Sequence, residues 1–107
     1  GPSSFQPIRI EFKICFLEAA ECELQCAMDY YNQQKQGLGY EFLAEIKATV
    51  GRIADFPEAW QPLSKRTRRC LTRRFPYGVI YQIRDEDILI IAVSHLHQRP
   101  MYWKDRL

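Results

Sequence analysis

Residues 8–16 alternate between apolar and polar side chains, which is the pattern of a strand with one buried face. From residue 17 the apolar residues recur at intervals of three and four, which predicts a helix that ends near Gly37. The helical spacing resumes at residues 42–53 and stops before Pro57. Because the glycine-rich connection between them is so short, the two helices should form an antiparallel hairpin.

Three further strand-like runs follow a loop and occupy residues 68–75, 77–84 and 87–95. The acidic residues 85–87 predict the tip of a hairpin between the last two runs. The last run is apolar on both faces, so we expect a central strand covered by the helices on one side and by the C-terminal segment on the other. The predicted order is β-α-α-β-β-β, an α+β domain whose helical hairpin packs on one face of a mainly antiparallel sheet. The position of the first strand within that sheet stays open.

The composition indicates one globular domain, because the chain has 107 residues, of which 47% are hydrophobic and 26% charged. Residues 1–4, Gly-Pro-Ser-Ser, resemble the remnant of a cleaved purification tag, so we assign the domain to residues 5–107. No apolar run approaches the roughly 20 residues of a membrane span, and no signal-peptide pattern is present. We therefore expect a cytoplasmic protein without a membrane partner.

The charges are distributed unevenly along the chain. Residues 1–63 contain five Lys/Arg and nine Asp/Glu, whereas residues 64–107 contain ten and four. Six of the cations lie within ten residues that include no carboxylate: Lys65, Arg66, Arg68, Arg69, Arg73 and Arg74. Such a cluster favours binding of nucleic acid or of an acidic protein segment. The alternative is a solvated edge strand that its charges protect from aggregation.

A second group of functional side chains follows the last predicted strand and comprises His95, His97, Arg99, Tyr102 and Trp103. A base of near-neutral pKa, a cation and an aromatic platform are the groups that metal-free phosphodiester cleavage needs. The alternative is structural: His95 and Trp103 cover the sheet, and Arg99 binds a carboxylate.

The sequence predicts neither a metal site nor a cofactor. Cys22 and Cys26 are spaced to share a face of a helix, and His95 and His97 to share a face of a strand, but no further ligand accompanies either pair. The four cysteines, which include Cys15 and Cys70, are expected to be reduced thiols. There is also no Gly-rich phosphate loop and no G-x-S-x-G motif.

Several segments together resemble the RelE/ParE superfamily of toxins from bacterial type II toxin–antitoxin systems. They are FLEAAECELQCAMDYYNQQKQGLGYEFLAEI, IADFPEAW, RRFPYGVIYQI and ILIIAVSHLHQRPMYW, with the first strand. The resemblance implies a small toxin that inhibits growth, serves plasmid stabilisation and is neutralised by a cognate antitoxin. A flexible, often acidic antitoxin segment would order on binding to the toxin.

The superfamily divides by target, and the resemblance leaves both branches open. The RelE branch cuts mRNA on the ribosome, whereas the ParE branch poisons DNA gyrase. The nuclease branch has an Arg after the Tyr that opens the strand matching YGVIYQI, where this chain has Gly78, and another Arg that falls near Gln98. The ParE branch is therefore favoured.

Two alternatives remain beside gyrase poisoning. If the chain is an enzyme, it is a metal-independent endoribonuclease, with Arg73, Arg99, Tyr102 and His97 as candidate catalytic residues. The second alternative is an inactive relative that only binds an antitoxin. The six clustered cations are the candidates for contact with the target or with nucleic acid.

Overall fold

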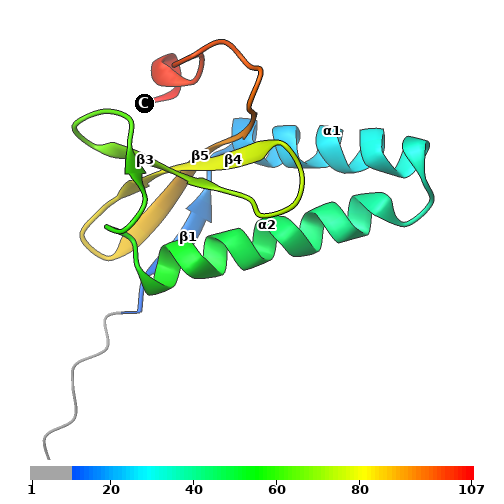
Figure 1. Ribbon diagram of the computed structural model, residues 1–107. Helices are drawn as coiled ribbons and strands as arrows, with labels where there is room; N and C mark the ends of the chain where they lie inside the picture. Colours follow the sequence, from blue (N-terminus) through cyan, green and yellow to red (C-terminus); the bar gives the residue numbers. More distant parts are fainter. Residues whose placement is uncertain (1–10) are drawn as a thin grey trace, which may run out of the picture.

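The structure is a computed structural model that describes residues 11–107, and in these residues two helices lie on one face of a five-stranded sheet (Figure 1). The α+β class and the predicted order are confirmed. The elements are β1 (Lys13–Phe16), α1 (Glu18–Gln34), α2 (Leu38–Asp55), β2 (Gln61–Pro62), β3 (Thr67–Leu71), β4 (Tyr77–Ile83), β5 (Asp87–His95) and a short 3-10 helix, η1 (Lys104–Arg106). The proposed tag remnant and the beginning of the predicted first strand lie outside the described residues. Neither helix is long and apolar enough to cross a membrane.

The strands are arranged in the order β1-β5-β4-β3-β2. β1 pairs with β5 in parallel, and the other neighbours are antiparallel. The first strand therefore lies at an edge, next to the last one. Between β4 and β5 the register shifts so that Ile80 faces Ala92 while Tyr81 faces Ile90, which leaves Ile91 as the extra residue of a bulge.

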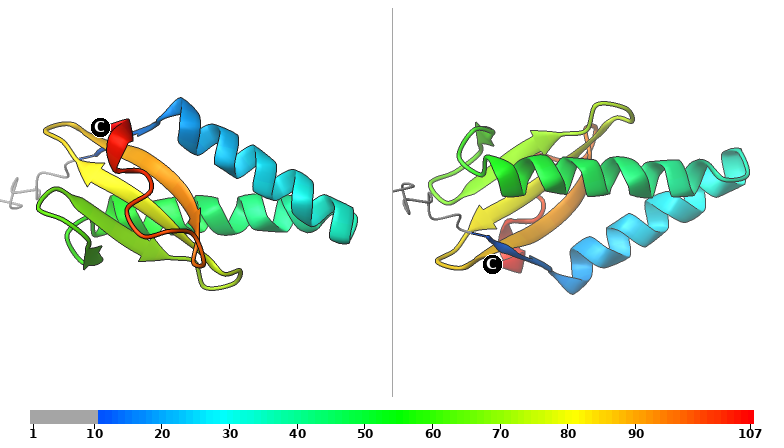
Figure 2. Two further views of the ribbon diagram at one scale, coloured as in Figure 1. Left: turned by 90° about the horizontal axis from the view of Figure 1, so that it is seen from above. Right: turned by 90° about the horizontal axis from the view of Figure 1, so that it is seen from below.

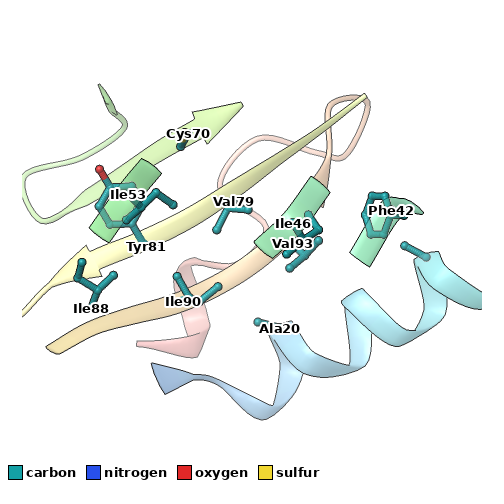
Figure 3. Close-up of a cluster of buried hydrophobic side chains, with 11 residues drawn as sticks. Ala20, Phe42, Ile46, Ile53, Cys70, Val79, Tyr81, Ile88, Ile90 and Val93 are labelled. Carbon is teal, nitrogen blue, oxygen red and sulfur yellow. The ribbon is translucent and has the colours of Figure 1, made fainter. Parts of the chain in front are cut away.

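The main core lies between the sheet and the two helices (Figure 3). Helical spacing brings Phe42, Ile46 and Ile53 to the side of α2 that faces the sheet, where each is buried. Alternation along β4 directs Val79 and Tyr81 to the same face. The two periods read from the sequence thus meet in one core.

The opposite face of the sheet is covered by the C-terminal segment, which runs back across the strands (Figure 2). Trp103 is 2% exposed and packs with Ile80, Leu89 and Ile91. The prediction that β5 is covered on both faces is confirmed, and Trp103 has the covering role that the structural alternative gave it.

The helical hairpin depends on two glycines with different tasks. Gly37 has φ 88°, a conformation that favours glycine, and ends the three-residue connection between α1 and α2. The N–H of Gly39 donates to Oδ1 of Asn32 at 2.7 Å, and a Cβ at position 39 would collide with the carbonyl oxygen of Met28. Gly39 therefore permits the close approach of the two helices.

The predicted strand over residues 68–75 is wrong in its second half, because β3 ends at Leu71. Residues 72–76 form the turn to β4, in which the Thr72 hydroxyl donates to the carbonyl of Phe75 at 2.7 Å and Phe75 has φ 66°. Pro76 has no N–H to give to a ladder, so pairing stops before it. Arg73 and Arg74 consequently lie in a turn.

Candidate target-binding site

The fold separates the six clustered cations into three places. Lys65 and Arg66 lie on the turn between β2 and β3, Arg68 and Arg69 on opposite faces of β3, and Arg73 and Arg74 on the turn to β4. The linear cluster is therefore divided among two turns and the two faces of β3.

Arg68 holds the loop that precedes β2. Its Nη1 donates to the carbonyl oxygens of Glu58 at 2.9 Å and Trp60 at 2.8 Å. The guanidinium thus satisfies two backbone acceptors while it keeps its charge near the surface.

Arg69 lies on the face of the sheet opposite the helices, where it pairs in register with Ile80. Its Nη2 donates to Oε1 of Gln61 at 2.8 Å, and its buried Nε has no hydrogen-bond partner in the described structure. A Cβ on Gly78 would lie 2.9 Å from Cδ and 3.0 Å from Cγ of Arg69. The glycine therefore provides the space through which the Arg69 side chain passes.

Two carboxylates of α2 anchor the turn that carries Arg73 and Arg74. Oε1 of Glu45 accepts the backbone N–H of Arg73 at 2.6 Å and that of Arg74 at 3.3 Å, and Oε1 of Glu41 pairs with Nη1 of Arg74 at 3.0 Å. The Arg74–Glu41 side chains are 60% and 45% exposed, so this ion pair adds little stability. Although residues 65–74 contain no acidic side chain, the fold brings two carboxylates of α2 to this turn.

The C-terminal segment is fastened by Glu23 of α1. Its Oε2 accepts the Tyr102 hydroxyl at 2.5 Å, while its two oxygens accept Nη1 and Nη2 of Arg106 at 2.8 and 3.1 Å. Oε1 also accepts the N–H of Val93 at 3.1 Å, and Nη1 of Arg106 donates to the carbonyl of Ile91 at 3.0 Å. One carboxylate therefore joins α1, β5 and the tail.

Tyr102 is among the residues predicted from the sequence, whereas Glu23 and Arg106 are not. The available signal was the position of Glu23 between Ala20 and Ala27, at helical spacing on the buried side of α1. The alternative in which Arg99 binds a carboxylate is wrong: Arg99 is exposed and forms no ion pair in residues 11–107, and Arg106 has that role.

Burial and, after it, the hydrogen bond to Glu23 together raise the pKa of Tyr102 to about 12. The Glu23 carboxylate also raises the pKa of Arg106. At neutral pH the Tyr102 hydroxyl is therefore protonated and committed to Glu23, which makes it a poor general base.

The nuclease candidates come together only in part. A hollow of about 150 Å³ on the face opposite the helices is lined by Arg69, His95, Arg99 and Tyr102 among others, whereas Arg73 and His97 do not line it. The His97 N–H donates to Nδ1 of His95 at 3.0 Å.

Three of the six clustered cations lie at the end of the sheet that carries both the β2–β3 turn and the β4–β5 turn (Figure 1). Here Lys65, Arg66, Arg68 and Arg84 line a hollow of about 760 Å³, which we call the basic hollow. Arg84 belongs to the hairpin tip that residues 85–87 predicted, and its N–H donates to the carbonyl of Asp87 at 2.8 Å.

Potential metal ligands do not gather within residues 11–107, where no group of three or more His, Cys, Asp or Glu side chains is arranged to hold an ion. Cys22 and Cys26 are exposed on α1, whereas Cys70 is buried in the main core.

A helical hairpin on one face of a mainly antiparallel sheet is the α+β architecture that the resemblance to the RelE/ParE superfamily implied. The family model for the ParE toxin of the type II toxin–antitoxin system parDE matches residues 14–100. The chain belongs to this family.

Similarity to individual proteins agrees with the family. Toxin ParE2 of Mycobacterium tuberculosis, from strains CDC 1551 / Oshkosh and ATCC 25618 / H37Rv, is 40% identical over 55 residues. This segment is 51% of the chain and 52% of each relative, so the match spans about half of the curated relatives' length. A chain of the chromosomal ParDE TA system from P. aeruginosa has the same fold, with a TM-score of 0.72 and 13% identity over 83% of this chain and 100% of that one.

Proposed function

We propose that this chain inhibits growth by poisoning DNA gyrase and that a cognate antitoxin neutralises it. Membership of the ParE family supports this target. The observation that carries the choice over RNA cleavage is the hydrogen bond from the Tyr102 hydroxyl to Glu23, which occupies that hydroxyl within the fold. Contact with the target falls to the basic residues of the β2–β3 and β3–β4 region and to the C-terminal segment.

Gly78 supports the same choice. An Arg at this position, as in the nuclease branch, would have to displace the Arg69 side chain that passes beside it. The cation that stabilises a pentacovalent phosphate in that branch therefore has no counterpart at position 78.

The test incubates the purified chain with gyrase, ATP and supercoiled plasmid, followed by denaturation with detergent and protease. We expect linear DNA that accumulates with toxin dose and only in the presence of gyrase. Adding an excess of the antitoxin encoded beside the gene should abolish it. Intact plasmid at doses that arrest growth contradicts the proposal.

Ribosome-dependent mRNA cleavage is the second candidate, because Arg69, Arg99 and Tyr102 line one hollow. Primer extension on ribosome-bound message distinguishes the two. Cuts at defined codon positions that disappear in Arg99→Ala would establish cleavage, and uncut message with broken DNA would exclude it. If expression has no effect on growth, the chain is an inactive antitoxin-binding relative.

A further inference from the structure

The basic hollow contains more positive charge than the contacts within the chain use. Four cations line it, Lys65, Arg66, Arg68 and Arg84, together with the carboxylates of Glu58 and Asp85. None of these cations forms an ion pair within residues 11–107, where the ion pairs are Arg74–Glu41 and Arg106–Glu23. The charge of the hollow is therefore available to a ligand.

Two of the cations are held in place by the protein itself. Arg68 is fixed by the carbonyl oxygens of Glu58 and Trp60, and Nε of Arg84 donates to Oε1 of Gln82 at 3.2 Å. Lys65 and Arg66 are exposed on the neighbouring turn, whose backbone is closed by the Leu63 N–H donating to the carbonyl of Thr67 at 2.9 Å. A ligand thus meets charges whose spacing is already set in part.

The side chains that line the hollow favour a phosphate backbone over an acidic peptide. Apolar lining comes only from Pro62, Ile83 and the stems of the long side chains. The hydroxyls of Ser64 and Thr67 bond to each other at 2.5 Å, so the groups left for a ligand are mainly the cations. A protein segment gains most of its affinity from apolar anchors in pockets. Phosphate oxygens are bound by cationic side chains without apolar anchors, and this hollow supplies four such cations.

We propose that the basic hollow binds the phosphate backbone of duplex DNA, so that the protein touches the DNA held by its target as well as the target. The part of this proposal in which the DNA is held by gyrase rests on the proposed function. Arg84, which the linear cluster does not include, is part of the contact, whereas Arg73 and Arg74 do not line the hollow and are not part of it.

The test measures fluorescence anisotropy of a labelled duplex of about 20 base pairs with the full chain, without gyrase, at increasing salt. Each phosphate contact contributes about 0.9 to the slope of log affinity against log salt. In the variant Lys65→Gln/Arg66→Gln/Arg84→Gln, the loss of three contacts should reduce the magnitude of this slope by about 2.7. Its affinity should therefore fall roughly 40-fold less than that of the wild type between 50 and 200 mM salt.

A matched control removes three exposed lysines elsewhere, Lys35→Gln/Lys47→Gln/Lys104→Gln, and thus the same net charge. The control should keep the wild-type slope within about one contact. Circular dichroism verifies that both variants are folded. The proposal is overturned if the wild type does not bind the duplex at 50 mM salt, if both variants lose equal slope, or if a polyglutamate peptide competes as well as unlabelled duplex.

Failure of this proposal is distinguishable from failure of gyrase poisoning. Suppose that the hollow variant equals the wild type both in trapping cleaved gyrase complexes and in binding DNA. The proposed DNA contact is then wrong, whereas the proposed target is right. If the wild type binds DNA through the hollow but traps no gyrase, the contact is right and the target is wrong.

Discussion

Glu23 and Arg106 form a two-point ion pair, at 2.8 and 3.1 Å, between the first helix and the last turn of the chain. Their side chains are 21% and 22% exposed, so the pair is more shielded from water than the Arg74–Glu41 pair. The same carboxylate holds Tyr102. The cover of the second sheet face therefore depends on one acidic side chain.

Glu23→Gln should lower the free energy of unfolding by about 2 kcal/mol, because it removes the charge that Arg106 and Tyr102 share. Urea denaturation measures the change. Glu21→Gln alters an exposed carboxylate on the same helix and should shift stability by less than about 0.5 kcal/mol. Equal effects of the two changes would mean that the tail does not depend on Glu23.

Gly39→Ala should destabilise the protein by about 2 kcal/mol, since the new methyl group would meet the Met28 carbonyl and the Asn32 amide. Gly51 offers the matched control, because it lies in the same helix and a Cβ there would have no atom within 4 Å. Gly51→Ala should stabilise by about 0.5–1 kcal/mol through helix propensity. Thermal or urea unfolding of both variants tests the opposite signs.

Gly78→Ala should cost about 1 kcal/mol by pressing on the Arg69 side chain. In the Arg69→Ala background the same change should cost little, because the crowded atoms are gone. A double-mutant cycle measures the difference, which we expect at about 1 kcal/mol. Additive effects would show that Arg69 does not constrain position 78.

Stability should decline with rising alkalinity, and Tyr102 should account for part of the decline. Its pKa is about 12 in the folded chain against an ordinary 10.0, so the unfolded chain releases the proton first. The stabilisation is complete below the unfolded value and is lost as the pH rises from about 10 to about 12. Urea unfolding across this range should show a steeper decline for the wild type than for Tyr102→Phe.

Tyr81, whose pKa burial also raises to about 12, is retained in both proteins and accounts for a shared decline. Parallel curves for the wild type and Tyr102→Phe would contradict the role assigned to Tyr102.

The elements were predictable because apolar spacing is a local signal with a large energetic consequence. Alternation before Phe16, helical spacing through Ile53 and the two-sided run of β5 each correspond to an observed element. The end of β3 was not predictable in this way, because Arg73 and Arg74 show no apolar periodicity. Their turn is fixed by Glu45, which lies in α2, far from the turn in the sequence.

The candidate site was predictable in its residue types but not in its grouping. The sequence identified the cations, whereas the fold sends Lys65 and Arg66 to one end of the sheet and Arg69 to the face that Trp103 covers. Arg84 joins the former only because β3 and β4 pair with Thr67 opposite Gln82. Such proximity depends on register, which side-chain chemistry alone does not encode.

The parallel pairing of β1 with β5 also bears on how the chain folds. It joins Lys13 to Asp87, residues near opposite ends of the sequence, whereas the β4–β5 hairpin is local. Loop closure over such a separation carries a large entropic cost, so the hairpin should nucleate early and the β1 edge should dock late. During synthesis the β1 edge then stays unpaired until the residues of β5 have left the ribosome.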